Sequence, residues 1–152
     1  MDEVDRAILH HLQTDGRMAN NELADRVGLS PSPCLRRVRR LEDEGTITGY
    51  AAILDRERVG CTYEPIVWVT LASVTRESML DFERALDDVD EIVEAARMMG
   101  QPDYLLRIVT ADAAAFEELY IERLARLPHV QTLTSQLAMK VVKRSTRLPI
   151  GG

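Results

Sequence analysis

The stretch "GLSPSPCLRRVRRLEDEG", residues 28–45, places four arginines within five positions, close behind two prolines. Proline suits the start of a helix, because the N–H groups of a first turn have no partner inside the helix. Pro31 and Pro33 both fall in such a first turn. Ser30 suits the N-cap before it, and Gly45 suits the end. The stretch therefore predicts a helix that begins at residue 31.

This helix would have two different faces. Cys34, Val38 and Leu41 recur at helical spacing and are expected to point inward. The arginines lie on the other side, and arginine forms bidentate contacts with guanine edges and phosphates. A solvated face balanced by the acidic residues 42–44 is the alternative. A short helix that ends at Gly28 precedes it, so the pair predicts a helix-turn-helix that contacts double-stranded DNA. We expect Ser32, Pro33, Arg36 and Arg39 in the major groove, and Ser30, Arg37 and Arg40 on the DNA backbone.

The pattern changes after a hinge-like segment, and an α+β domain follows. Period-two runs rich in β-branched residues predict strands, and apolar stripes at helical spacing predict helices. The order is β-α-β-β-α-β, which is the ferredoxin-like arrangement. Residues 45–54 also have β character. We expect a DNA-binding domain at 1–50, a linker strand and hinge at 51–61, and the ferredoxin-like domain at 62–150.

Composition and charge exclude several classes of function. The net charge of −6 means that only a local patch can attract DNA. No apolar run approaches the ~20 residues that span a membrane, so a cytoplasmic protein is expected. Cys34 and Cys61 provide no disulfide framework, and Cys34 is expected in the core. His10 and His11 are adjacent on a helix and diverge by about 100°, which disfavours a metal site. We expect no enzyme activity, cofactor or metal.

Two stretches carry a resemblance to a known family: "VDRAILHHLQTDGRMANNELADRVGLSPSPCLRRVRRLEDEGTITGYAAIL" and "GQPDYLLRIVTAD". The sequence resembles the Lrp/AsnC transcriptional regulators of bacteria and archaea over almost its whole length. The resemblance implies a winged helix-turn-helix, a ferredoxin-like effector domain, and homodimers that assemble further to tetramers or octamers. It also implies a sequence-specific regulator whose DNA affinity or assembly responds to a small amino acid. An architectural DNA-organising protein and an amino-acid sensor or small enzyme are the alternatives.

The same resemblance implies an effector site at the loop after the second strand of the effector domain. By themselves, Gly100 and Asp103 fit an ordinary β-turn. In the family this loop faces the ligand, so Asp103 would meet the α-ammonium group of an amino acid, and nearby backbone N–H groups its carboxylate. Met98 and Tyr104 would line the pocket, and a neighbouring subunit would contribute Thr134, Ser135 and Gln136.

Two features leave alternatives open. Trp68 suits either a dimer interface or the core of its own domain. The basic segment 140–147 suits either an edge strand protected by charge or a supplementary DNA contact.

Overall fold

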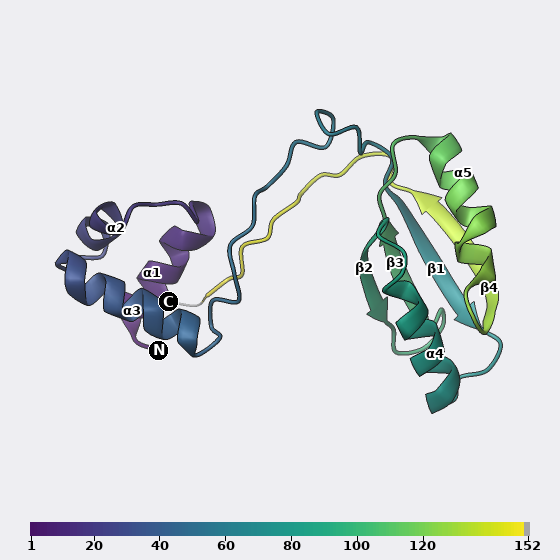
Figure 1. Ribbon diagram of the computed structural model, residues 1–152, viewed down its shortest axis with the longest axis horizontal. Helices are drawn as coiled ribbons and strands as arrows, with labels where there is room; N and C mark the ends of the chain where they lie inside the picture. Colours follow the sequence, from purple (N-terminus) through teal and green to yellow (C-terminus); the bar gives the residue numbers. More distant parts are fainter. Residues whose placement is uncertain (151–152) are drawn as a thin grey trace. The chain divides into compact units, whose positions relative to one another are not determined.

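The computed structural model describes residues 1–150 and divides the chain into two units. The first unit contains Met1–Ile53 together with residues 142–150, and the second contains Leu54–Val141 (Figure 1). This division differs from the expected one in that the last residues group with the N-terminal unit. No helix in the described part of the chain is long and apolar enough to cross a membrane.

Three helices form the N-terminal unit and bury one small apolar core. They are α1 (Glu3–Thr14), α2 (Asn20–Arg26) and α3 (Pro31–Asp43). Helix α3 begins at residue 31 as predicted, and Ser30 is its N-cap, although the serine side chain makes no capping hydrogen bond. Cys34 and Leu41 are buried against α1 and α2, which confirms the inward face of α3.

The connection between α2 and α3 has the geometry of a helix-turn-helix. Gly28, just after α2, has a φ of +70°, in the left-handed region that favours glycine. The Asn20 side chain at the start of α2 donates from Nδ2 to the Pro31 carbonyl oxygen at 2.9 Å. This bond fixes the beginning of α3 relative to α2.

The segment after α3 contains no strand, so the β structure expected at 45–54 is wrong. A strand needs a second segment to accept its ladder of hydrogen bonds, and the described chain provides none here. The Ile47 N–H instead donates to the Leu41 carbonyl oxygen at 2.9 Å, and the Ile47 side chain packs against the N-terminal core. Tyr50 donates its hydroxyl to Glu42 Oε1 at 2.9 Å.

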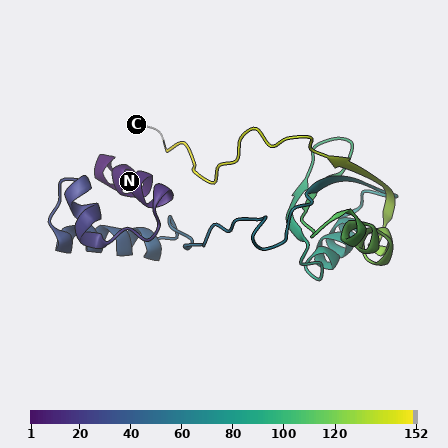
Figure 2. The same cartoon turned by 90° about the horizontal axis from the view of Figure 1, so that it is seen from above.

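The second unit has the predicted β-α-β-β-α-β order. Its antiparallel sheet has the strand order β2-β3-β1-β4, and α4 and α5 cover one face of this sheet (Figures 1 and 2). The ferredoxin-like arrangement is thereby confirmed. The elements are β1 (Pro65–Leu71), α4 (Arg76–Leu86), β2 (Ile92–Arg97), β3 (Tyr104–Ile108), α5 (Ala113–Glu122), a 3-10 turn (Leu124–Arg126) and β4 (Val130–Leu137).

Alternation along β1 separates a buried face from an open one. Val67 and Val69 are buried beneath the helices, whereas Trp68 and Thr70 are half-buried on the other face. Trp68 is paired with Thr134 of β4, so these two side chains share the open face. Trp68 is therefore not part of its own domain's core, and that alternative is wrong.

The C-terminal segment of residues 142–150 binds the N-terminal unit. The Gln13 side chain of α1 forms two hydrogen bonds with the backbone of Leu148: Nε2 donates to its carbonyl oxygen at 3.3 Å, and Oε1 accepts from its N–H at 2.5 Å. Arg147 donates to Thr14 Oγ1 at 3.3 Å, and Ile150 packs against the core of the three helices. Strand β4 ends at Leu137, so the edge strand considered for 140–147 is wrong.

These contacts predict that the C-terminal segment stabilises α1. In a chain that ends at Ser145, hydrogen exchange of the α1 amides should become about tenfold faster, because the tail contacts are lost. Gln13→Ala should reproduce part of this increase, and Gln131→Ala on exposed β4 should not. Unchanged exchange in the shortened chain would show that the segment contributes nothing to the unit.

Candidate DNA interface and effector pocket

The four arginines of α3 have two different environments. Arg37 and Arg40 form ion pairs with the same carboxylate, that of Asp5 in α1. Arg37 Nη1 lies 2.8 Å from Asp5 Oδ1, and Arg40 Nη2 lies 2.6 Å from Asp5 Oδ2. Arg37 Nη1 also lies 2.8 Å from Asp2 Oδ2. The side chain of Asp5 is 1% exposed, so the charge of α1 that holds these two arginines is desolvated.

The start of α1 fixes the position of this carboxylate. Asp2 and Asp5 form a capping box, in which the Asp5 N–H donates to Asp2 Oδ1 at 2.9 Å and the Asp2 N–H donates to Asp5 Oδ2 at 3.1 Å. Burial by itself raises the pKa of Asp5, but the hydrogen bonds from Asp2, Arg37 and Arg40 outweigh it and lower the pKa to about 2. The Asp5 carboxylate is therefore ionised at neutral pH.

Arg36 and Arg39 lie on the outer face of α3, and both are exposed. Neither has a hydrogen bond or an ion pair within residues 1–150. Together with Ser32, Leu35, Arg40 and Asp43 they border a shallow hollow on the outer surface of the helix. The ion pairs thus divide the arginine cluster into two residues that bind Asp5 and two that have no such partner among the described residues, and the Arg40 side chain is also 47% exposed. Of the other expected DNA contacts, Ser30 and Ser32 are exposed and Pro33 is half-buried.

Cys34 lies directly behind this face and is fully buried. Burial raises the pKa of its thiol, which disfavours the reactive thiolate. This confirms the expectation that Cys34 is a core residue.

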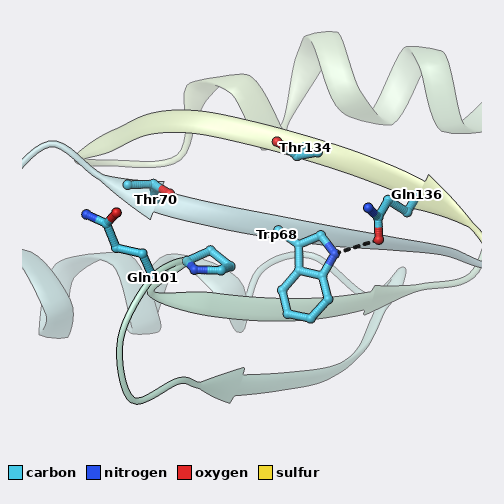
Figure 3. Close-up of a pocket in the computed structure, with 6 residues that line it drawn as sticks. Trp68, Thr70, Gln101, Thr134 and Gln136 are labelled. Carbon is cyan, nitrogen blue, oxygen red and sulfur yellow. Dashed lines mark hydrogen bonds between the residues drawn. The ribbon is translucent and has the colours of Figure 1, made fainter.

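An open hollow of about 490 Å³ lies on the helix-free face of the second unit (Figure 3). Trp68 crosses it and donates from Nε1 to Gln136 Oε1 at 3.0 Å. Alternation along β1 could have identified Trp68 and Thr70 as site residues, but the sequence interpretation did not use it. The lining residues are Trp68, Thr70, Gln101, Pro102, Thr134 and Gln136.

The loop that borders this hollow is attached to β1 by Asp103. The Asp103 N–H donates to the Val69 carbonyl oxygen at 2.9 Å, and its Oδ2 accepts from the Leu71 N–H at 2.8 Å. The Met98 N–H donates to the Asp103 carbonyl oxygen at 2.7 Å and so closes the loop. Gly100, near the middle, has a φ of +105°, which favours glycine. The Oδ1 atom of Asp103 has no hydrogen-bond partner among the described residues.

Two residues expected in this pocket lie on the opposite face of the sheet. Tyr104 is 2% exposed, and its ring centroid lies 4.7 Å from that of Phe82, a buried residue of α4. Ser135 is paired with Val67, whose side chain faces the helices, so a strand's alternation turns Ser135 away from the hollow. Thr134 and Gln136 do line it, whereas Met98, which is exposed, and Gly100 and Asp103 are not among its lining residues.

Two family models match the chain, and the second of them extends into the C-terminal segment that contacts the first unit. Residues 1–42 match the AsnC-type helix-turn-helix domain, and residues 64–148 match the Lrp/AsnC ligand binding domain. Within residues 1–150, no three His, Cys, Asp or Glu side chains are grouped to hold a metal ion.

The chain is also similar to curated and solved regulators. It is 42% identical over 150 residues to the leucine-responsive regulatory proteins of Escherichia coli K12 and Salmonella typhimurium, covering 99% of this chain and 92% of each relative. A transcriptional regulator of Neisseria meningitidis, solved with L-Met, has a TM-score of 0.94 and 35% identity, covering 99% of this chain and 97% of that one. An AsnC family regulator of Agrobacterium tumefaciens has a TM-score of 0.93 and 37% identity with the same coverage.

The ion pairs of Asp5 predict an acid-sensitive contribution to stability. The pKa of Asp5 is lowered from 3.8 to about 2 on folding, so the contribution is complete above the unfolded pKa and is lost as the pH falls through the folded one. Its size is about 2 kcal/mol, and the loss falls between about pH 5 and about pH 2. Urea unfolding should show that Asp5→Asn lowers stability at neutral pH and flattens this acid-dependent loss, whereas Asp25→Asn does neither. The same acid-dependent loss in Asp5→Asn and in the unaltered chain would refute the role of Asp5.

Proposed function

The chain belongs to the Lrp/AsnC family of transcriptional regulators, and from this premise we propose how its residues bind DNA and an amino acid. It is a DNA-binding regulator with a helix-turn-helix domain and an amino-acid-binding domain. We assign it to the bacterial cytoplasm, where it would meet chromosomal DNA.

The outer face of α3 enters the major groove of DNA. The observation that carries this assignment is the division of the arginines, since Arg36 and Arg39 are exposed and without ion pairs in the described chain. They contact base edges and phosphates together with Ser32 and Pro33, while the exposed hydroxyl of Ser30 contacts the backbone at the start of the helix. Arg37 and Arg40 remain on Asp5 and support binding by holding α3 at its angle to α1.

The effector pocket takes an amino acid between the loop and the open face of the sheet. Asp103 Oδ2 is occupied by the Leu71 N–H, and Oδ1 is left to accept a hydrogen bond from the ligand's α-ammonium group. Trp68 and Pro102 provide apolar surface for the ligand side chain. Because the relatives are named leucine-responsive and one solved neighbour holds L-Met, leucine and methionine are the first amino acids to test.

A second copy of the chain covers the same open face. Ile66, Trp68 and Leu105 lie on this face, because Trp68 is paired with Leu105 across β1 and β3 and side chains alternate along each strand. A symmetric dimer would present two α3 helices to DNA half-sites about one helical turn apart. An amino acid that binds one dimer arrangement or assembly more tightly shifts DNA affinity by that difference. Further assembly to tetramers or octamers belongs to the same proposal.

Replacing an outward arginine should weaken DNA binding and relax its specificity. Arg36→Ala should lose about 1–3 kcal/mol of binding free energy on the DNA upstream of the protein's own gene, because one contact to a base edge is missing. Fluorescence anisotropy at fixed salt measures this loss. Arg84→Ala removes the same charge from exposed α4 and should bind normally. Equal loss in both variants, or equal affinity of the unaltered chain for random DNA, would favour an architectural role.

The effector assignment predicts amino-acid binding that depends on the charge of Asp103. Isothermal titration with L-leucine and L-methionine should give a Kd at least about tenfold weaker in Asp103→Asn, because an amide cannot attract the ammonium group. The asparagine oxygen can still accept from the Leu71 N–H, so the loop is retained. Equal heats in the two proteins would remove Asp103 from the site.

A further inference from the structure

The effector loop, defined as Met98–Asp103, starts and ends at two residues that face each other. Arg97 is the last residue of β2, Tyr104 is the first of β3, and the two are paired in the sheet. Directly opposite residues share one face, so both side chains lie on the helix-covered side. Arg97 and Tyr104, the stems of the loop, therefore face α4 and point away from the hollow that the loop borders.

A single side-chain oxygen of α4, Glu83 Oε1, accepts hydrogen bonds from both stems. Tyr104 donates its hydroxyl to Glu83 Oε1 at 2.8 Å, and Arg97 donates from Nε to the same oxygen at 2.9 Å. Arg97 Nη2 makes a further short contact with this oxygen. The hydrogen bond from Arg97, and to a smaller extent the one from Tyr104, lowers the pKa of Glu83, so the carboxylate is charged at neutral pH. Phe82, the neighbour of Glu83, is fully buried and packs against the Tyr104 ring at an interplanar angle of 44°.

The remaining attachments of the effector loop join Asp103 to the backbone of Val69 and Leu71 in β1. The loop is therefore held by α4 at its stems and by β1 at its end, and between these attachments Gln101 and Pro102 line the hollow. A loop held in its binding geometry loses less entropy when a ligand binds.

We propose that Glu83 is a positioning residue of the effector pocket, which sets amino-acid affinity by holding both stems of the effector loop from the far side of the sheet. The inference rests on the proposed function for its ligand, but the position of the loop does not. Glu83 lies on the helix-covered side and is not among the residues that line the pocket, so it acts only through Arg97 and Tyr104.

The test uses the full chain and three variants. Glu83→Ala removes both contacts, Tyr104→Phe removes only the hydroxyl, and Glu122→Gln breaks a comparable exposed ion pair with Arg126 at 2.8 Å. Titration with L-leucine and L-methionine should show a Kd about tenfold weaker in Glu83→Ala and a smaller weakening in Tyr104→Phe. Glu122→Gln should bind as the unaltered chain does, and DNA affinity without an amino acid should stay within about twofold in all of them.

Hydrogen exchange without any ligand provides the second readout. The amides of Met98 and Asp103 should exchange about tenfold faster in Glu83→Ala, while those of α5 keep their rates. If neither amino acid binds the unaltered chain, the proposed effector fails, and the exchange rates still decide whether Glu83 positions the loop. Unchanged exchange at both amides, unchanged affinity beside measurable binding, or uniformly faster exchange across the unit would each overturn the proposal.

Discussion

The DNA-binding unit depends on the ion pairs and hydrogen bonds made by the buried carboxylate of Asp5. A desolvated charge is costly unless it is paired and hydrogen-bonded. Asp5 forms ion pairs with Arg37 and Arg40 and accepts a hydrogen bond from the Asp2 N–H. These bonds join the start of α1 to the middle of α3 and fix the rotation of α3 about its own axis. That rotation in turn directs Arg36 and Arg39 outward. A single acidic residue thus divides a run of arginines into two that it binds, Arg37 and Arg40, and two that remain without an ion pair in the described chain.

In the second unit, the sheet determines which side chains face the helices and which face the hollow. Alternation along each strand directs one set of side chains to the helices and the other to the open face, where the hollow forms. Glu83 of the covering helix α4 binds Arg97 and Tyr104, the stems of a loop whose Gln101 and Pro102 line the hollow on the open face. In both units, we propose that side chains away from the ligand determine where the ligand-contacting side chains point.

Much of this could be predicted from sequence, because the relevant signals are local. Pro31 and Pro33 located the start of α3, the spacing of its apolar residues gave its buried face, and strand periodicity gave the β-α-β-β-α-β order. The features that could not be predicted depend on partners distant in the chain. The pairing of Asp5 with Arg37 and the binding of residues 142–150 to α1 have no local pattern. Tyr104 and Ser135 were misplaced because a family resemblance names a strand's residues without the register that assigns each to a face.

The arginines of α3 are expected to keep their division of roles when DNA is bound. A crystal structure of the full chain on a DNA fragment from upstream of its own gene would test this. We predict that Arg36 and Arg39 lie in the major groove, while Arg37 and Arg40 stay within hydrogen-bond distance of Asp5. Arg37 or Arg40 on a base edge, with the Asp5 carboxylate abandoned in the interior, would contradict it.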